Sequence, residues 1–313
     1  MMKGVSERVK EKVLSLGFSH AGIAPAGPLE EEAVHLREWL ARGYQASMAW
    51  MERSSREDPR RVLSGARSVI VTAMNYYTPV RHQEEAGVGK VSRYAWGEDY
   101  HRVVLRKLNE LQAWVEKEFP GERALAYVDT GPLAEKALAV RAGIGWQGKH
   151  TNVITTDQGS WVFLGEVVTT LDIPQDVPAL DHCGSCTLCI EACPTGAIVE
   201  PYVVDSARCL SYLTIEHRGP VNQPPAYEGW IYGCDICQDV CPWNEKFAQP
   251  SSEPAFQPRQ GNVAPRLEEW EKMTEEGFRE KFAGSPIRRA KWEGLLRNVR
   301  IVQAQQPGTA REV

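Results

Sequence analysis

All eight cysteines of this 313-residue chain lie between Cys183 and Cys241, and residues 1–182 contain none. The first four form the run Cys183-x2-Cys186-x2-Cys189-x3-Cys193-Pro194. A second run, Cys234-x2-Cys237-x3-Cys241-Pro242, repeats its end, and Cys209 precedes it. Three thiolates at i, i+3 and i+6 can bind three corners of an iron–sulfur cubane, while the fourth thiolate sits on the following helix and points away. This stretch is therefore expected to fold around metal ligands.

The first run has the spacing of bacterial two-cluster ferredoxins, in which the fourth cysteine of each run binds the other cluster. Two zinc sites are the alternative, because CxxC pairs also fit tetrahedral zinc. Zinc ribbons rarely use a CxxCxxCxxxCP run, so the pattern favours two [4Fe–4S] clusters that carry single electrons. The crossed pattern predicts Cys183, Cys186, Cys189 and Cys241 as the ligands of cluster 1, and Cys193, Cys209, Cys234 and Cys237 as those of cluster 2.

The rest of the composition is that of an ordinary globular protein, with 42% hydrophobic and 25% charged residues and a formal net charge of -5. No apolar run is long enough to span a membrane. The start, MMKGVSERVKEKVLSLGF, has neither an apolar signal core nor a twin-arginine pair, so we expect a cytoplasmic protein. Thiols stay reduced in that compartment, which supports metal ligation over disulfides.

Strand-like and helix-like patterns alternate through the first 170 residues. Apolar runs at 68–74 and 123–129 predict strands, and the spacing of apolar residues over about 100–117 predicts a helix. The segments 151–156 and 160–170 resemble a hairpin around Asp157-Gln158-Gly159. We therefore expect an α/β (α+β) domain over residues 1–175, a two-cluster module over 176–248 and a basic helical segment over 249–313.

Asp129 is the most informative polar residue of the first domain. It ends an apolar strand and precedes Gly131-Pro132, a favourable helix start. A carboxyl group there, shielded by a bulky cofactor, could have a raised pKa and serve as a general acid, but it could equally cap the next helix. No GxGxxG follows a strand and no GxxxxGK[ST] occurs, so neither a Rossmann nucleotide site nor a P-loop is supported.

Several longer segments carry a family resemblance. They are SRYAWGEDYH (92–101), YVDTGPLAEKALAVRAGIGWQGKHTNVI (127–154), GSWVFLGEV (159–167), CGSCTLCIEACPTGAI (183–198), ARCLSYLTIE (207–216) and YGCDICQDVCPWN (232–244). In this order they resemble the epoxyqueuosine reductases. The resemblance implies a cobalamin-binding domain similar to that of reductive dehalogenases, followed by a two-cluster module. The helical-repeat extension of longer members is expected to be absent.

The resemblance also implies an activity. Members of the family reduce epoxyqueuosine to queuosine at the wobble position of tRNA, using base-off cobalamin fed by two [4Fe–4S] clusters. By motif position, Asp129 is the expected proton donor and also contacts the cofactor. The other expected cofactor-binding residues are Arg56, Tyr94, Asp99, Tyr100, His101, Arg141, Gln147, Lys149, Asn152, Asp235 and Ile236. His150 stands where the family commonly has asparagine.

A tRNA partner fits poorly with the negative net charge, because phosphate contacts dominate nucleic-acid affinity. However, the segment from Arg279 to Arg300 holds seven basic residues against two acidic ones. The expected tRNA-binding residues are Ser211, Arg288, Arg289, Lys291 and Arg297. We further expect an external low-potential electron donor, no membrane association and a monomer. The alternatives are a cobalamin-dependent reductase of a small molecule and a noncatalytic two-cluster electron carrier.

Overall fold

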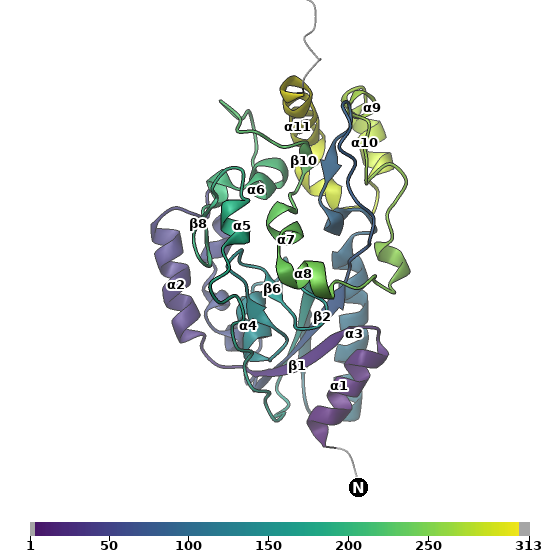
Figure 1. Ribbon diagram of the computed structural model, residues 1–313. Helices are drawn as coiled ribbons and strands as arrows, with labels where there is room; N and C mark the ends of the chain where they lie inside the picture. Colours follow the sequence, from purple (N-terminus) through teal and green to yellow (C-terminus); the bar gives the residue numbers. More distant parts are fainter. Residues whose placement is uncertain (1–3, 307–313) are drawn as a thin grey trace, which may run out of the picture.

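The structure is a computed structural model, and it describes residues 4–306 (Figure 1). At its centre is a four-stranded sheet in the order β1-β2-β7-β4, in which every neighbouring pair is antiparallel. The strands are β1 (His20–Pro25), β2 (Ser68–Asn75), β4 (Ala124–Tyr127) and β7 (Val162–Thr169). Every residue of β2 is buried, which explains why the sequence there is continuously apolar rather than alternating.

Both faces of the sheet are covered, and side chains alternate between the two faces along each strand. Ile70 joins the core beneath α1 (Val5–Ser15) and α3 (Tyr100–Glu118). Val69 and Val71 point the other way, toward the start of α2 (Glu30–Ala41) and toward α4 (Glu135–Arg141). The predicted strand at 68–74 and helix at about 100–117 are thus confirmed. The loop that follows β4 and leads to α4 carries Asp129.

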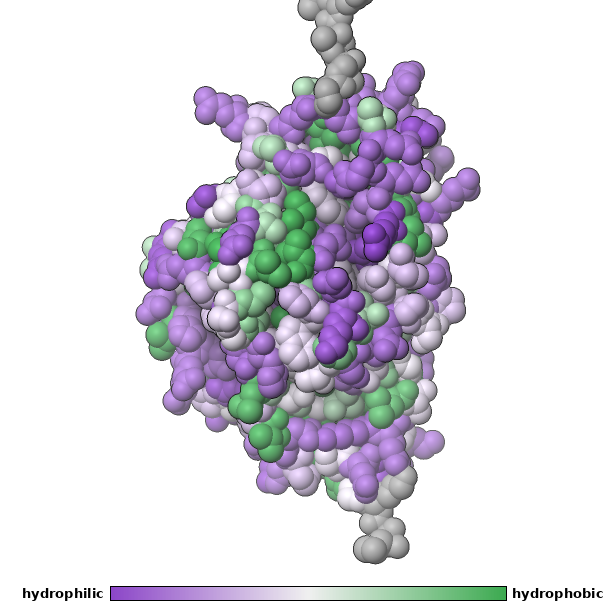
Figure 2. All heavy atoms as spheres, in the orientation of Figure 1, coloured by the Kyte–Doolittle hydropathy of each residue, from purple (hydrophilic) through white to green (hydrophobic). Residues whose placement is uncertain are grey.

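The cysteine-rich part consists of short elements that lie against one edge of this domain (Figure 1). Two four-residue helices, α5 (Leu188–Glu191) and α7 (Ile236–Asp239), pack together, one from each cysteine run. The remaining elements are β8 (Ile198–Glu200), β9 (Val203–Val204), α6 (Leu210–Ile215) and α8 (Pro242–Phe247). Hydrophilic side chains cover most of the face drawn in Figure 2, and apolar ones gather near its centre, in the region of α5 and α7.

A second core joins three distant stretches of the chain. The parallel pair β3 (Lys90–Val91) and β10 (Trp230–Tyr232) packs with α6 and with the C-terminal helices. These helices are α9 (Leu267–Glu271), α10 (Glu275–Lys281) and α11 (Lys291–Gln305), which together bury a set of large apolar side chains against β10. The C-terminal segment is therefore helical, as expected, and shares its core with the cysteine-rich part. The division of the chain at residues 175 and 248 stays a prediction.

The short elements complete the fold. β5 (Trp146–Gln147) and β6 (Val153–Ile154) pair with each other, so the hairpin expected between 151–156 and 160–170 is reduced to one bridge between Thr155 and Gly159. The sheet partners of β7 are β2 and β4 instead. Within residues 4–306, no helix is both long and apolar enough to cross a membrane. The 3-10 helices are η1 (Ala49–Glu52), η2 (Ser54–Arg56), η3 (Pro59–Arg61), η4 (Arg93–Ala95), η5 (Ser206–Arg208), η6 (Pro254–Phe256) and η7 (Pro286–Ala290).

Candidate active site

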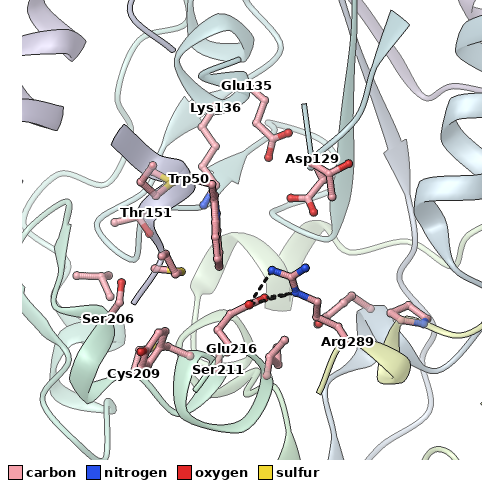
Figure 3. A pocket seen from close by; sticks show the side chains of 18 of the residues that line it. Trp50, Asp129, Glu135, Lys136, Thr151, Ser206, Cys209, Ser211, Glu216 and Arg289 are labelled. Atoms are coloured by element: carbon pink, nitrogen blue, oxygen red, sulfur yellow. Dashed lines mark hydrogen bonds and ion pairs between the residues drawn. The ribbon is translucent and has the colours of Figure 1, made fainter. Parts of the chain in front are cut away.

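Two cavities meet at Asp129. The larger one, of about 1760 Å³, opens between α2, the α/β domain, α6 and the C-terminal segment. The smaller one, of about 360 Å³, extends from Asp129 toward α6 and α7, where the cysteines lie. Figure 3 shows Asp129, Glu135 and Lys136 on one side of a cavity, and Cys209, Ser211 and Arg289 on the opposite side. A reacting group at this junction could reach both solvent and the metal-ligating region.

Asp129 belongs to a chain of three hydrogen-bonded side chains. His101 Nδ1 lies 2.7 Å from Asp99 Oδ1, and His101 Nε2 lies 2.8 Å from Asp129 Oδ2. Asp99 also caps α3, since its carboxylate accepts from the main-chain N–H of His101. Although burial lowers the pKa of His101, its hydrogen bonds to Asp129 and Asp99 raise that pKa to about 9. At neutral pH the histidine is therefore a cation that donates from both ring nitrogens.

Of the three hydrogen-bonded side chains, His101 carries the proton. Burial raises the pKa of Asp129, but the hydrogen bond and charge of His101 outweigh burial and leave that pKa below its ordinary value. Asp129 also has a φ of 39°, in the left-handed region that side chains other than glycine rarely adopt. Such strain is typical of functional loops. The pair Asp129–His101 together stores one proton at the junction of the cavities.

Aromatic rings pack against the hydrogen-bonded side chains of Asp99, His101 and Asp129. The ring of Tyr100 stacks on His101 with 4.1 Å between centroids and on Phe163 with 4.2 Å. Tyr94 donates to the hydroxyl of Tyr232 at 3.1 Å, and Tyr232 donates to the carbonyl of Pro286 at 2.7 Å. Tyr94 and Tyr100 both line the smaller cavity, opposite thiols of the predicted cluster 2. The walls are therefore apolar and flat, and suit a large planar ligand.

The eight thiols are all unbridged. Cys189 has Cys183, Cys241 and Cys186 as its electrostatic neighbours. Cys234 has Cys209 and Cys193, and Cys237 has Cys234, Cys209 and also Cys189. Burial and these neighbours raise the pKa of the Cys189 thiol to about 11, so four adjacent thiolates require a cationic metal centre. The donor sets fit two iron–sulfur clusters, and the one containing Cys193 and Cys209 faces the smaller cavity. The assignment of the thiols to the two clusters stays a prediction.

Hydrogen bonds between the cysteine-rich part and the α/β domain hold the two against each other. The buried carboxylate of Asp235 accepts from the main-chain N–H of Arg93 at 2.7 Å and from the hydroxyl of Ser92. Asn244 accepts from the main-chain N–H of Ser160 at 2.6 Å, where Gly159 leaves no room for a Cβ. Ser92 and Ser160 also line the smaller cavity, so these contacts join the two parts of the chain beside it.

The other predicted cofactor-binding residues divide into two groups. Arg56 and Gln147 line the larger cavity, and Asn152 and Ile236 line the smaller one. Three residues lie outside both cavities. Arg141 forms an ion pair with Glu32 at 2.8 Å, Lys149 donates to the carbonyls of Gly184 and Cys186, and Asp235 makes the contacts given above.

The predicted tRNA-binding residues divide in the same way. Arg288, Arg289 and Lys291 line the wide mouth of the larger cavity, and Ser211 lines both cavities. Arg289 pairs with Glu216 at 2.8 Å, and its guanidinium lies 5.2 Å from the ring centroid of Trp50. Arg297 points elsewhere and donates to the carbonyls of Leu213, His217 and Gly219, which ties α11 to the loop after α6.

Sequence reasoning missed a group of charged residues beside Asp129. Glu135 and Lys136 begin α4 and line both cavities. Glu166 lies on β7 opposite Tyr127 and is only 1% exposed. A single carboxylate inside the apolar run WVFLGEVV was a signal that this strand carries an unusual acid.

Comparisons with known proteins agree with this geometry. The family model for epoxyqueuosine reductase QueG (DUF1730) matches residues 56–130, and that of a 4Fe-4S double cluster binding domain matches residues 182–244. An epoxyqueuosine reductase from Synechocystis sp. is 50% identical over 282 residues, which cover 88% of this chain and 98% of that protein. A second, from Cellulophaga algicola, is 43% identical over 94% of this chain and 96% of its own length.

Two solved structures have the same fold. An epoxyqueuosine reductase bound to a tRNA-Tyr stem loop modified with epoxyqueuosine matches with a TM-score of 0.88 and 30% identity, over 97% of this chain and 82% of that one. The enzyme from Bacillus subtilis, described with its aspartate catalytic loop swung out of the active site, matches with a TM-score of 0.86 and 29% identity, over 95% and 80%. With a 4Fe-4S double cluster binding domain and half of its residues identical to such an enzyme over most of its length, the chain belongs to the epoxyqueuosine reductase family of oxidoreductases.

Proposed function

We propose that this protein reduces epoxyqueuosine to queuosine at the wobble position of tRNA in the cytoplasm, with cobalamin as the cofactor and the Asp129–His101 pair as the proton donor. The observation that carries the proposal is the place of that pair. It lies where a wide, basic-rimmed cavity meets a narrow one lined by thiols of the predicted cluster 2. Substrate, cofactor and electron source would thus converge on one proton store.

The residues around the junction of the two cavities fit a corrin, whose size requires the larger cavity of about 1760 Å³ as well as the smaller one of about 360 Å³. Tyr94 and Tyr100 provide flat apolar walls, and Asn152 and Ser211 provide hydrogen-bonding groups for its amide side chains. The thiols of Cys193 and Cys209 close one end of the smaller cavity, so electrons from cluster 2 would cross a short distance. Cobalamin bound here supplies a strongly reducing cobalt centre that can open an epoxide.

The chain's own residues then handle the proton. The opening epoxide oxygen would leave as a poor alkoxide unless it is protonated. Asp129 faces the cavity, and His101 behind it holds the proton at neutral pH. When cofactor and substrate exclude water from the cavity, desolvation raises the pKa of the Asp129 carboxyl and favours proton transfer from the imidazolium to the carboxylate.

The wide mouth suits an anticodon loop. Arg288 and Lys291 line it without an acidic side chain within ion-pairing distance among residues 4–306, so both can contact phosphates. Trp50 lies beside Arg289 at the same cavity and offers a face on which a base can stack. The negative net charge of the whole chain is therefore compatible with a local tRNA site.

The test is anaerobic reconstitution with iron, sulfide and cobalamin, followed by epoxyqueuosine-containing tRNA and a low-potential reductant. We expect queuosine to form, and we expect Asp129→Asn to slow its formation about 100-fold or more with both clusters and the cofactor retained. A fully loaded wild-type protein that forms no queuosine contradicts the proposal. Clusters without bound corrinoid would instead favour a noncatalytic electron carrier.

A further inference from the structure

The proposed reaction consumes two protons, and the Asp129–His101 pair stores one. Converting an epoxide to an alkene breaks both C–O bonds, forms one C=C bond and releases the oxygen as water. The balance requires two electrons, which the external donor delivers one at a time through the clusters, and two protons. The first proton converts the alkoxide to a hydroxyl group, and the second converts the departing hydroxide to water. When a bound anticodon loop covers the larger cavity, a second acid that lines the cavity would supply this proton directly.

Glu135 occupies the position for that acid. It is the first residue of α4, six positions after Asp129, and both residues line the same two cavities. Figure 3 shows the two side chains projecting into the same space from neighbouring segments. The main-chain amide of Asp129 also interacts with the Glu135 carboxyl group. A substrate oxygen that reaches Asp129 therefore lies close to Glu135 as well.

The surroundings keep Glu135 partly protonated. Burial and the nearby charge of Asp129 together raise the pKa of Glu135 to about 7, against the opposing effects of Lys136, Arg56 and the main-chain amide of Asp129. The hydroxyl of Tyr100 faces the same two carboxyl groups and interacts electrostatically with both. An ordinary glutamate would be fully ionised at neutral pH and could donate nothing. Near pH 7, a group of this kind can both give and regain a proton.

A third carboxyl group, that of Glu166, interacts electrostatically with both Glu135 and Asp129. Glu166 is 1% exposed, and its Oε1 atom has no hydrogen-bond partner among residues 4–306. Burial raises its pKa well above the ordinary value, with Glu135 and Asp129 adding to the effect and Arg56 opposing it. A buried carboxyl group without a partner is costly unless it stays protonated. The raised pKa of Glu166 favours its neutral form beside Glu135.

We infer that Glu135 supplies the second proton of each turnover, after the Asp129–His101 pair has supplied the first. The inference rests on the proposed function. The proton moves from the Glu135 carboxyl group to the oxygen that leaves on cleavage of the second C–O bond, and that oxygen departs as water. The carboxylate left on Glu135 is balanced by Arg56 and Lys136. Release of the product tRNA then reopens the cavity to solvent, from which both stores are refilled.

The test compares Glu135→Gln with wild type and with Glu110→Gln, the same chemical change at an exposed position of α3 outside both cavities. Single-turnover rates of queuosine formation are measured from pH 5.5 to 9 with enzyme already loaded and reduced. We expect the wild-type and Glu110→Gln rates to fall above about pH 7, where Glu135 loses its proton. Glu135→Gln is expected to be slower by about 10- to 100-fold and to lose that limb of the profile.

Two further measurements separate chemistry from folding. Glu135→Asp keeps an acid, so it should retain the limb near neutral pH at a reduced rate. Infrared titration of the protein without tRNA should show a protonated-carboxyl band that disappears near pH 7 in wild type and is missing in Glu135→Gln. If Glu135→Gln does not fold, the aspartate variant and the wild-type infrared titration decide. A wild-type rate without the limb near pH 7, or a Glu135→Gln profile equal to that of wild type, overturns the inference. A loaded wild-type enzyme that forms no queuosine counts against the proposed function instead.

Discussion

The carboxylate of Asp129 lies 2.8 Å from Nε2 of His101, a ring whose opposite nitrogen is held by Asp99 at 2.7 Å. Two carboxylates on one imidazole favour its charged form, which is why the pKa of His101 rises to about 9 despite burial. Asp99 also caps the helix that carries His101. Asp99 thus fixes the position of the proton store and, together with Asp129, its charge.

Asp99→Asn should lower the pKa of His101, because an amide accepts a hydrogen bond without contributing charge. Titration of the His101 ring followed by NMR should show its pKa moving from about 9 toward the ordinary value of 6.5. We expect the rate of queuosine formation to fall at pH 8, where wild type still holds the proton. Asp157→Asn is the matched control, since Asp157 pairs with His20 at the surface. A His101 pKa unchanged in Asp99→Asn would contradict this account.

The hydrogen bonds of His101 to Asp129 and Asp99 also make the stability of the protein depend on pH. Because the folded-state pKa of His101 is raised, its stabilising contribution is complete below the ordinary histidine pKa of 6.5 and is lost as pH rises through about 9. Thermal melts of the wild-type protein should therefore show the midpoint falling between pH 7 and 9.5. The fall should be smaller in His101→Gln. Equal pH dependence in the two proteins would assign the effect to other groups.

Single-cysteine variants should remove one cluster at a time. Cys209 has Cys193 as an electrostatic neighbour, and Cys183 is a neighbour of Cys189 and Cys241. Cys209→Ser should lose cluster 2 and Cys183→Ser should lose cluster 1, each reducing bound iron from about eight to about four atoms per chain. The variant without cluster 2 should lose reduction of the cofactor, since that cluster faces the smaller cavity. Iron analysis and EPR spectra check both statements. The two variants losing the same cluster would contradict the crossed pattern.

The sequence predicted the elements whose apolar pattern lies within a short stretch of the chain. A continuous apolar run predicted the strand at 68–74, and the spacing of apolar residues predicted the helix at about 100–117. Both are present, as β2 and α3. Asp129 does follow a strand, and in parallel α/β sheets ligands bind at the carboxyl ends of the strands. This sheet is antiparallel, so that rule does not explain the position of Asp129. The loop conformation and the contact with His101 place it instead.

The missed residues depend on contacts between distant segments. Glu135 and Glu166 are ordinary carboxylates in sequence, and only the approach of β7, α4 and the Asp129 loop changes their protonation. The hairpin expected around Gly159 is wrong because β6 pairs with β5, while the partners of β7 are β2 and β4. Arg297 shows the same limit for charge patterns, since its place in a basic run does not reveal that its guanidinium binds main-chain carbonyls.

Charge changes along the C-terminal segment should separate binding from folding. The double variant Arg288→Glu and Arg289→Glu should weaken tRNA binding about tenfold or more and reduce its salt dependence, because both residues line the mouth of the cavity. Arg297→Ala should instead lower the thermal midpoint, since it removes hydrogen bonds to three carbonyls, at a cost of about 2 kcal/mol. Fluorescence anisotropy with labelled tRNA at two salt concentrations, together with melting curves, tests the contrast. Affinity unaffected by the double charge reversal would contradict the location of the tRNA site.

His150 lines the smaller cavity and carries a buried nitrogen without a hydrogen-bond partner among residues 4–306. Its ring is 4% exposed, and its Nδ1 atom accepts from the main-chain N–H of Asn152 at 3.2 Å, so Nε2 carries the hydrogen. That Nε2 atom has no partner among residues 4–306, and the residue lines the smaller cavity. Burial lowers the pKa of His150 to about 4, so the ring is neutral at working pH. A buried donor of this kind needs an acceptor, which an amide carbonyl of the cofactor would provide.

Replacing His150 by phenylalanine should therefore weaken cobalamin binding while leaving both clusters in place. The loss of one hydrogen bond predicts about a tenfold increase in Kd, measured by equilibrium binding of cobalamin to the reconstituted protein. His150→Asn keeps a donor on a smaller side chain and should bind more tightly than the phenylalanine variant. Because the ring is neutral, the difference in affinity between the wild-type and phenylalanine proteins should not change between pH 6 and 8. Equal affinities of the wild-type and phenylalanine proteins, with both folded and fully loaded with iron, would show that Nε2 does not contact the cofactor.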